Sequence, residues 1–280
     1  MANINPNNID EKKNGLYIVS TPIGNMQDIT LRAVEVLKSS DFILCEDTRN
    51  SKKILNKFEI KSKLIANHKF NEKKNLSKII DLLKEGYLIS LISDAGTPAI
   101  SDPGKILINH CIKENIQIIP IPGVSAVTTS SSISGFSDKF YFHGFLSDTD
   151  NSIRKEFEFF NNFGSSVIFF ISAQKLKKKF ELLKKFFQQR DILICRELTK
   201  LHESFYRGRV SEMNISNFTP KGEVTVVISE IKNTDNGDLD ESDKKKIRKS
   251  IQTKSIKDIV RLISQEKNIS KSKIYNYCLK

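Results

Sequence analysis

The sequence has few cysteines and no long apolar segment, and both absences exclude classes of protein. Its 4 Cys stand far apart and form no Cys-x-x-Cys pair, so we expect neither a disulfide framework nor a bound metal. Residues 167–171 form the densest apolar run, which is far shorter than a membrane-spanning helix requires. Residues 1–13 are polar and asparagine-rich, without the apolar region of a secretory signal. We therefore expect a soluble, cytoplasmic protein with no membrane partner.

Common nucleotide-binding and hydrolase motifs are also missing. The chain has no G-x-x-x-x-G-K-[ST] loop and no G-x-G-x-x-G fingerprint, which disfavours P-loop nucleotidases and Rossmann dinucleotide enzymes. It has no G-x-S-x-G elbow, so serine hydrolysis lacks support. What is present is the composition of a folded protein: 39% of the 280 residues are hydrophobic and 18 are Phe. This length favours two domains over one compact core.

The positive charge is concentrated at the C-terminal end. The formal net charge is +12, but residues 244–280 hold 12 basic and 2 acidic residues, whereas residues 1–243 hold 33 basic and 31 acidic residues. A cluster of this kind is typical of a surface that contacts phosphate groups. In a chain this rich in lysine, the alternative is a basic surface that is merely solvated.

The basic segment also has a helical pattern. Ile256, Ile259 and Ile263 recur at helical spacing, and Ser270 is a possible N-cap before residues 271–277. This pattern predicts a small helix-turn-helix-like unit. Such a unit could bring lysines to a nucleic-acid backbone without reading its sequence.

Short apolar runs alternate with amphipathic stretches through the rest of the chain. The runs expected to form strands are 16–20, 42–45, 88–92, 116–119, 140–142, 167–171, 192–195 and 224–228. Helical patterns cover 29–37, 76–83, 106–112 and 176–187. The alternation predicts an α/β protein with mostly parallel sheets in two lobes. The expected divisions are a disordered N-terminal extension (1–14), an N-terminal α/β lobe (15–124), a C-terminal α/β lobe (125–232), an acidic linker (233–243) and a basic helical domain (244–280).

Three loops that follow strands share small and rigid residues. They cover residues 21–25, 93–98 and 120–126, and each contains Gly and Pro. Ligands of open α/β sheets bind beyond the carboxyl ends of the strands, where glycine permits close approach to the backbone. Strand-to-helix turns need Gly and Pro in any case, but three such loops at corresponding positions favour a small-molecule pocket.

The residues in and around these loops resemble a known family. The carrying segments are 16–25, 28–33, 46–49, 93–98 and 102–104, with further matches at 68–72, 122–126, 144–146, 196–200 and 222–223. In this order and spacing, they resemble the ribosomal RNA small subunit methyltransferase I family of the tetrapyrrole methylase superfamily. The resemblance covers about residues 15–230, and the tail looks like the family's helix-turn-helix-like domain.

This resemblance implies a two-lobed enzyme with S-adenosyl-L-methionine in the cleft between the lobes. The implied reaction methylates the ribose 2′-hydroxyl of a cytidine in the decoding region of small-subunit (16S) rRNA, and family members commonly form homodimers. The basic tail would then help to hold the RNA. Two alternatives stay open: a methyltransferase of the same superfamily that acts on a tetrapyrrole or other small molecule, and a non-catalytic ribosome-associated RNA-binding factor.

The cofactor site expected from the resemblance is built mainly of backbone and small side chains. Its residues are Pro22, Gly24, Ser93, Asp94, Ala95, Gly96, Thr97, Pro98, Ser125, Ala126, Phe170 and Glu223. A carboxylate near the sulfonium or the reacting hydroxyl is favoured electrostatically. Asp47, Asp94, Glu197 and Glu223 are the candidates.

The expected catalytic residues each have a structural alternative. Asp47 can accept a hydroxyl proton beside Arg49, whose guanidinium can bind phosphate, or the two can form a pair that only fixes the turn. Asn25 either orients the ribose or caps the following turn. Lys200 can meet a phosphate or be a surface lysine, and Glu197 can serve the site or pair with the neighbouring arginine.

One segment departs from the family pattern. After the apolar run at 167–171, the family usually carries an aromatic-Glu-small-x-His-Arg sequence. Here the acid, histidine and arginine are replaced by Ile171, Gln174 and Lys175. Lysine keeps a charge but lacks the fork geometry of arginine, so rate or specificity is expected to change, whereas backbone contacts from Phe170 would survive.

Overall fold

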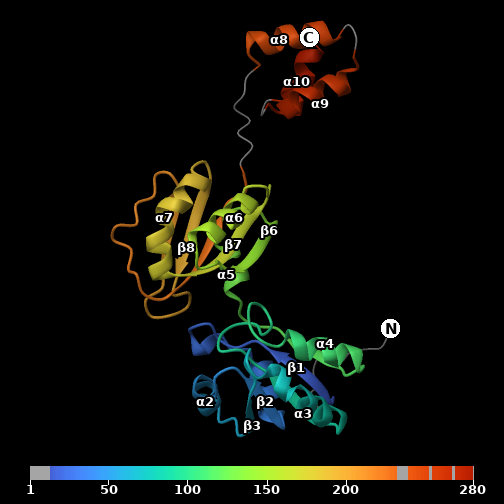
Figure 1. Cartoon of the computed structure of the whole chain (residues 1–280), viewed down its shortest axis with the longest axis vertical. Helices are drawn as coiled ribbons and strands as arrows, with labels where there is room; N and C mark the ends of the chain where they lie inside the picture. Colours follow the sequence, from blue (N-terminus) through green and yellow to red (C-terminus); the bar gives the residue numbers. More distant parts are fainter. Residues whose placement is uncertain (1–12, 232–238, 252–253, 267–268, 280) are drawn as a thin grey trace. The chain divides into compact units, whose positions relative to one another are not determined.

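The computed structural model describes residues 13–231, 239–251, 254–266 and 269–279 (Figure 1). The chain separates into two compact units, one that ends at Glu230 and one that begins at Ile231. The first unit contains two five-stranded sheets. Among the described residues, no helix is long and apolar enough to cross a membrane.

The first sheet is wholly parallel, with strand order β3-β2-β4-β1-β5. Its strands are β1 (Gly15–Val19), β2 (Phe42–Cys45), β3 (Lys63–Ala66), β4 (Leu88–Leu91) and β5 (Ile118–Ile121). The helices that follow them are α1 (Leu31–Ser39), α2 (Thr48–Lys57), α3 (Glu72–Lys84) and α4 (Lys105–Lys113). Apolar side chains of α1 and α2 pack on one face of the sheet and those of α3 and α4 on the other, so the sheet is buried between two helical layers.

The strand order places a crevice between β1 and β4. These strands are neighbours, yet α1 and α4 follow them on opposite faces of the sheet. Thr21 and Gly96, in the loops after the two strands, exchange both backbone hydrogen bonds, at 2.9 and 3.0 Å. The crevice outside the carboxyl ends of strands at such a reversal is where α/β sheets bind ligands.

The second sheet is mixed, which corrects the expectation of mostly parallel sheets. Its strands are β6 (Phe140–Phe145), β7 (Ser166–Ser172), β8 (Asp191–Arg196), β9 (Ser204–Arg209) and β10 (Glu223–Ile228), in the order β6-β7-β10-β8-β9. Only β6 and β7 pair in parallel. The connection 197–203 between β8 and β9 is too short for the crossover that a parallel pair requires, so these strands form an antiparallel hairpin.

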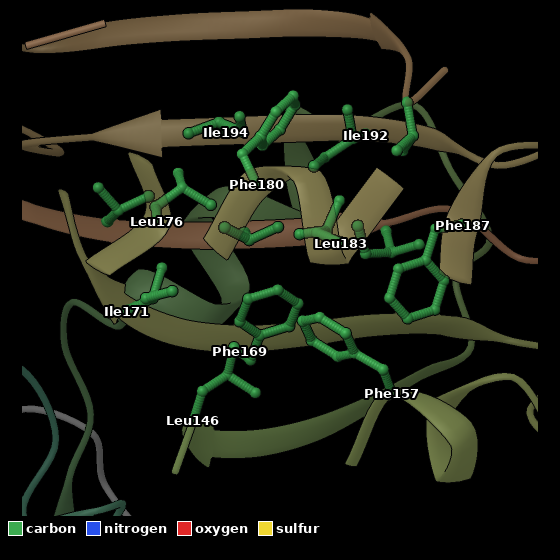
Figure 2. Close-up of a cluster of buried hydrophobic side chains, with 14 of the residues drawn as sticks. Leu146, Phe157, Phe169, Ile171, Leu176, Phe180, Leu183, Phe187, Ile192 and Ile194 are labelled. Carbon is green, nitrogen blue, oxygen red and sulfur yellow. The ribbon is translucent and has the colours of Figure 1, made fainter. Parts of the chain in front are cut away.

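Aromatic side chains fill the core on one face of the second sheet. Helices α6 (Asp150–Phe160) and α7 (Ala173–Phe187) pack there, and Figure 2 shows their side chains meeting those of the strands. Phe157, Phe169, Phe180 and Phe187 are each at most 2% exposed. The opposite face of this sheet is partly covered by α5 (Ala126–Ser132) and by Ile23, which comes from the loop after β1.

Each strand expected from the apolar runs is present, but one is displaced. Residues 116–119 were expected to form a strand, whereas β5 covers Ile118–Ile121. Asn115 has a positive φ of 55° and ends α4, and Ile116 N–H donates to the Cys111 carbonyl of that helix. Pro120 is tolerated within β5 because this strand lies at the sheet edge.

The apolar pattern did not predict β3, β9, α2, α5 or α6. Strand β3 is only four residues long and half-exposed, so it lacks a buried run. Helix α5 has the sequence AVTTSSS, whose serines and threonines favour caps and turns over helix interiors.

The second unit is a three-helix domain with its own isoleucine core. Its helices are α8 (Glu241–Ile251), α9 (Ile256–Glu266) and α10 (Lys271–Cys278), and Ser270 caps α10 as expected. Helix α8 begins three residues before the expected start of the basic domain at 244, so the end of the expected linker is helical. The physical reason is a reciprocal cap in which Asp240 and Asp243 each accept the other's backbone N–H. Residues 1–12 and 233–238 of the expected extension and linker lie outside the described residues.

Candidate active site

A pocket of about 300 Å³ lies between the two sheets of the first unit. One side, the first wall, is formed by residues 94–97 and by Ile100, Ser101 and Asp102, all from the segment after β4. The other side, the second wall, is formed by residues 170–172 of β7, 223–225 of β10, Cys195, Leu198 and Lys200. The predicted site residues that line the pocket are Asp94, Ala95, Gly96, Thr97, Ser125, Ala126, Phe170, Lys200 and Glu223.

Hydrogen bonds hold the first wall in a fixed shape. The buried Ser93 hydroxyl donates to the carbonyls of Ala95 and Gly96, at 3.2 and 3.3 Å. The Thr97 hydroxyl lies 3.0 Å from that of Ser20, at the end of β1. The wall therefore presents small side chains whose positions depend on buried hydroxyls behind them.

Some predicted cofactor residues support the pocket without lining it: Pro22, Gly24, Ser93 and Pro98. Gly24 shows why its residue type matters. A Cβ at this position would lie 2.4 Å from Cγ of Lys200 and 2.9 Å from the Leu198 carbonyl oxygen. Glycine thus lets the loop after β1 pack directly against the loop that carries Lys200.

Asp47 and Arg49 form a pair at the start of α2. Asp47 is the N-cap of this helix, and its Oδ1 accepts from the Arg49 backbone N–H at 2.8 Å. Nη2 of Arg49 donates to Oδ2 of Asp47 at 2.7 Å. These bonds from the Arg49 side chain and backbone lower the pKa of Asp47 to about 2. The turn-fixing alternative is therefore present, and a carboxylate this acidic is a weak base.

The start of α2 is joined to the pocket through Asp94. Asp94 Oδ1 accepts from the Asp47 backbone N–H at 3.3 Å, and its Oδ2 accepts from Nδ2 of Asn50 at 3.1 Å. Asp47 and Arg49 do not line the pocket themselves, so their catalytic roles stay a prediction.

Asp102 is the pocket carboxylate that the sequence assignment missed. It lines the first wall and is half-buried. Burial, with the nearby negative charges of Glu46 and Asp94, raises the pKa of Asp102 to about 6, although a hydrogen bond with Ser93 opposes this shift. The available signal was its place in the Asp-Pro-Gly segment 102–104, which formed part of the resemblance.

A three-membered ion-pair group stands on the second wall. Nζ of Lys200 lies 3.0 Å from Oε1 of Glu197 and 2.9 Å from Oε2 of Glu223. Glu197 has a positive φ of 53° and also accepts from the Glu223 backbone N–H at 2.9 Å. Burial raises the pKa of Glu197, but the Glu223 N–H and Lys200 outweigh it and lower the pKa below its usual value. Burial lowers the pKa of Lys200, but the two carboxylates outweigh that effect and raise it.

The rest of the second wall is largely apolar, and most of it was not predicted. Phe170, Ile171, Cys195 and Val224 come from the central strands of the second sheet, where nothing in the sequence pattern separates a pocket residue from a core residue. Burial raises the pKa of Cys195 to about 12, so its thiol stays protonated and inert.

The segment that departs from the family pattern keeps its place at the pocket. Ile171 and Ser172 line the second wall, and the Ser172 side chain caps α7 by accepting from the Lys175 N–H. Nζ of Lys175 donates to the Leu146 carbonyl at 2.8 Å and to Asp148 at 2.9 Å. The substituted side chain is thus committed to a loop of the second lobe and does not line the pocket.

Asn25 acts as a cap in this structure. Its side-chain oxygen accepts from the Gln27 backbone N–H at 3.0 Å, and its own backbone N–H donates to the Thr199 hydroxyl at 3.0 Å. This is the turn-capping alternative. Contact of Asn25 with a ribose stays a prediction.

Two α/β sheets that enclose a cofactor-sized pocket, with small and acidic residues facing an apolar wall, define the two-lobed methylase class. The chain belongs to the tetrapyrrole methylase family: the family model for tetrapyrrole (corrin/porphyrin) methylases matches residues 15–214. This match confirms the expected fold class and the superfamily inferred from the loop motifs.

Curated relatives extend the comparison. The chain is 43% identical over 224 residues to the ribosomal RNA small subunit methyltransferase I of Thermotoga maritima, covering 76% of this chain and 97% of that protein. It is 38% identical over 275 residues to the protein of the same name from Buchnera aphidicola, covering 95% and 96%. Among solved structures, the uroporphyrin-III-C-methyltransferase of Thermus thermophilus has a TM-score of 0.53 at 16% identity, covering 78% of this chain and 95% of that one, and shares the fold.

The pocket fits S-adenosylmethionine, the methyl donor of this family. Its volume lies within the range of about 300 to 1,000 Å³ that small-molecule sites occupy. Apolar strands form one side, and Asp94 and Asp102 supply negative charge on the other for a ligand that carries a sulfonium and an ammonium group. Cofactor contacts of Ala95, Gly96 and Thr97 would be made largely through their backbone.

Proposed function

We propose that this protein methylates the ribose 2′-hydroxyl of a cytidine in the decoding region of small-subunit ribosomal RNA, with S-adenosylmethionine as the donor. The observation that carries the proposal is the 43% identity, over nearly the whole length of the relative, to a protein named ribosomal RNA small subunit methyltransferase I. The choice of nucleotide and of the 2′-oxygen rests on the resemblance of the loop motifs.

The pocket supports methyl transfer by positioning. When bound, S-adenosylmethionine supplies a methyl group on a sulfonium, which a nucleophile attacks in line. The protein must then hold the ribose oxygen against that methyl carbon and exclude water, and such alignment alone can contribute a large share of a rate enhancement. The second wall suits this role because Phe170, Ile171 and Val224 give it an apolar surface.

We assign Asp102 as the base that accepts the proton of the ribose hydroxyl. As the bond from the ribose oxygen to the methyl carbon forms, the bond from that carbon to sulfur would break, leaving a neutral thioether. The hydroxyl proton must also leave, and a carboxylate in the pocket can accept it. Each of the other candidate acids already has partners: Asp47 pairs with Arg49, Asp94 accepts from the start of α2, and Glu197 shares Lys200 with Glu223. Asp102 lines the pocket, and no cation pairs with it among the described residues. Its hydrogen bond with Ser93 does not offset the burial that raises its pKa to about 6.

The second-wall ion pairs have a different role. Lys200 is held by Glu197 and Glu223, so its ammonium has a fixed position at the pocket. We assign it to a phosphate of the bound nucleotide, with Glu223 beside the cofactor. Arg49 is exposed on the α2 side and is available to a second phosphate through the part of its guanidinium that Asp47 does not occupy.

The basic C-terminal unit and the oligomeric state complete the proposal. The three-helix unit would hold the RNA through its lysines, in a homodimer located in the cytoplasm. Light scattering on the purified chain tests the dimer. Removal of residues 244–280 tests whether the C-terminal unit holds the RNA. We expect affinity for the RNA substrate to fall and affinity for the cofactor to stay unchanged.

The reaction is tested by label transfer. Purified full-length protein is incubated with methyl-labelled S-adenosylmethionine and small ribosomal subunits from cells that lack the protein, and the rRNA nucleosides are then separated by mass spectrometry. We expect the label in 2′-O-methylcytidine. Label on a different nucleoside, or only on added uroporphyrinogen, would contradict the proposal. Binding to subunits without any transfer would favour the non-catalytic factor.

A further inference from the structure

Basic residues are concentrated in one part of the first lobe. Residues 49–78 contain ten Lys or Arg and two Asp or Glu, whereas the rest of residues 13–124 contain six basic and ten acidic residues. The nearly balanced charge of the first 243 residues therefore conceals a strongly positive region. This region consists of α2, β3 and the start of α3.

The fold places part of this region beside the pocket. Strand β3 is the edge strand of the first sheet, and α2 and α3 pack on opposite faces near it (Figure 1). Both helices begin at the carboxyl ends of the strands before them, which is the end that carries the pocket loops. We call the exposed residues at this end the β3 rim. They are Lys52, Lys53, Lys69, Phe70, Lys73 and Lys74.

The lysines of the β3 rim carry uncompensated charge. Among the described residues, no ion pair involves any of them, and Lys53 makes only a 3.5 Å hydrogen bond to Asn50. Glu72, which precedes Lys73 in the chain, is buried and accepts from the backbone N–H groups of Ile106 and Leu107 instead. Five exposed ammonium groups therefore have no paired carboxylate among the described residues, and such a surface attracts a polyanion.

Helix α7 shows what an ordinary lysine-rich surface looks like in this protein. Lys179 pairs there with Asp150, and Lys184 lies 3.9 Å from Glu181. Acidic neighbours thus balance part of the charge of that helix. No lysine of the β3 rim has such a pair among the described residues, and this difference favours a binding role over a merely solvated surface.

Phe70 stands fully outward among these lysines. It is 92% exposed, although its loop is held in place from within. The His68 backbone N–H donates to Oδ1 of Asn71 at 2.7 Å, and the Phe70 N–H donates to Nδ1 of His68 at 3.3 Å. A rigidly presented aromatic ring next to basic side chains is a common surface for stacking an unpaired base.

The β3 rim is continuous with the pocket. Asn50, about one turn before Lys53 on α2, donates to the pocket-lining Asp94 at 3.1 Å. The Asp47 N–H at the start of the same helix donates to the other oxygen of Asp94. A chain lying on the rim would therefore lead directly to the first wall.

We propose that the β3 rim binds a single-stranded stretch of the RNA substrate, with lysines on the phosphates and Phe70 stacked on a base, and so feeds the target nucleotide to the pocket. This inference rests on the proposed function and adds an RNA-binding surface separate from the basic C-terminal unit. Such contacts are independent of sequence, so they position the strand while the pocket selects the nucleotide.

The test compares two triple variants of the full-length chain. The rim variant is Lys53→Gln, Lys69→Gln and Lys74→Gln. The control variant is Lys155→Gln, Lys178→Gln and Lys185→Gln, which changes the same charge at exposed, unpaired lysines of the second lobe. Filter binding measures affinity for protein-free small-subunit rRNA and for intact small subunits, each at several salt concentrations. Calorimetry measures affinity for S-adenosylmethionine, and thermal unfolding checks the fold.

We expect the rim variant to bind RNA at least tenfold more weakly than the control variant. The slope of log affinity against log salt should fall by about 2, because each lost phosphate contact on a single strand contributes about 0.7. Cofactor affinity and unfolding temperature should match the wild type. Phe70→Ala should cost about tenfold in RNA affinity, and Phe70→Tyr should restore it.

Three results would overturn the proposal. One is equal affinity and salt dependence in the rim and control variants, and another is a wild-type chain that binds no RNA. The third is a loss of affinity for intact subunits but not for protein-free rRNA, which would identify an acidic ribosomal protein as the partner. Rim-dependent RNA binding without methyl transfer would instead reject only the proposed reaction.

Discussion

The two walls of the pocket are built in different ways. The first wall is made of loops after parallel strands, and its shape depends on small residues and hydroxyls such as Gly96 and Ser93. The second wall is made of strand faces in a mixed sheet, backed by the aromatic core around Phe157 and Phe169. The first wall carries the acid assigned to the proton, and the second carries the apolar surface and Lys200.

This difference separates chemistry from binding. A change at Asp102 of the first wall should act mainly on turnover, because we assign this carboxylate to the reacting hydroxyl. Changes in the second wall should act mainly on affinity, because its side chains contribute area and position. Four variants probe the two walls, from the largest expected effect to the smallest. Asp102→Asn and Phe170→Ala test the division itself, and the other two test contacts that hold the walls.

Asp102→Asn should reduce kcat by about 10² to 10⁴, because the amide cannot accept the hydroxyl proton. Cofactor affinity should change much less. In the wild type, kcat/KM should rise with pH through about 6 and then level off, since the base acts in its deprotonated form and its pKa is about 6. Methylation rates across a pH series check this, with Asp47→Asn as the comparison; equal losses in both variants would deny Asp102 a special role.

The same variant should not lose stability. The folded-state pKa of Asp102 lies above the unfolded value, so this group favours the fold at low pH, and its contribution disappears as pH rises through about 6. Above pH 6 the buried, ionised carboxylate therefore lowers the free energy of unfolding, and an amide at this position carries no such charge. The variant should be more stable than the wild type at pH 8, by on the order of 1 kcal/mol once partial exposure is considered. Thermal unfolding at pH 5 and pH 8 measures the difference.

Gly24→Ala tests the contact between the walls. The added methyl group meets the Leu198 carbonyl and Lys200, and a backbone carbonyl cannot move aside cheaply, so we expect a destabilisation of about 1 to 3 kcal/mol. The control is Gly164→Ala, where nothing lies within 4 Å of the new Cβ. Urea unfolding should show a loss only for Gly24→Ala. Equal midpoints would mean that the loops do not depend on this close approach.

Phe170→Ala tests the second wall. Phe170 lines the pocket, and its ring centroid lies 5.0 Å from that of Phe142 and 5.2 Å from that of Phe145. Losing this surface should weaken cofactor binding by about 1.5 kcal/mol, roughly tenfold, with little further change in kcat. Phe159→Ala removes an aromatic side chain of α6 that does not line the pocket, and calorimetry should find its cofactor affinity unchanged. A kcat effect larger than the affinity effect would break the division between the walls.

Lys200→Met removes the ion pair with Glu197 and should lower the free energy of unfolding by about 0.5 to 1 kcal/mol at neutral pH. The loss is small because both side chains are partly exposed. Glu197 has a lowered pKa, so its contribution is present above the unfolded value near 4.3 and is lost as pH falls below it. Lys200 has a raised pKa, so its contribution is lost as pH rises beyond about 10. The difference in free energy of unfolding between the variant and the wild type should thus be largest between these two pH limits. Lys184→Met, at the loose pair with Glu181, should show almost no gap.

The sequence predicted the first wall well and the second poorly. Loops 21–25 and 93–98 combine Gly, Pro and small polar residues at strand ends, and such local chemistry is readable without a fold. Thr225 and Cys195 carry no such signal, because their approach to a ligand depends on which strands become neighbours in a mixed sheet. Asp102 was missed for a related reason: its proton affinity arises from burial and from Glu46, which is distant in the chain.

The two basic surfaces also differ in how readily the sequence reveals them. The basic tail is visible because its lysines lie close together in sequence. Helix α8 begins at Glu241, three residues before the expected start of the domain, because Asp240 caps it. The β3 rim is harder to see because acidic residues elsewhere in the first lobe cancel its charge in any sum. Its lysines lie within residues 49–78, and the placement of α2 and α3 beside the edge strand β3 brings them to one edge of the sheet.

The most direct test is a crystal structure of the full-length protein with S-adenosylhomocysteine, the demethylated product. The account predicts that the ligand touches residues 94–97 of one wall and Phe170 or Thr225 of the other, with its sulfur open toward Asp102. A ligand bound outside this pocket, or bound there with its sulfur sealed away from any incoming nucleotide, would contradict it.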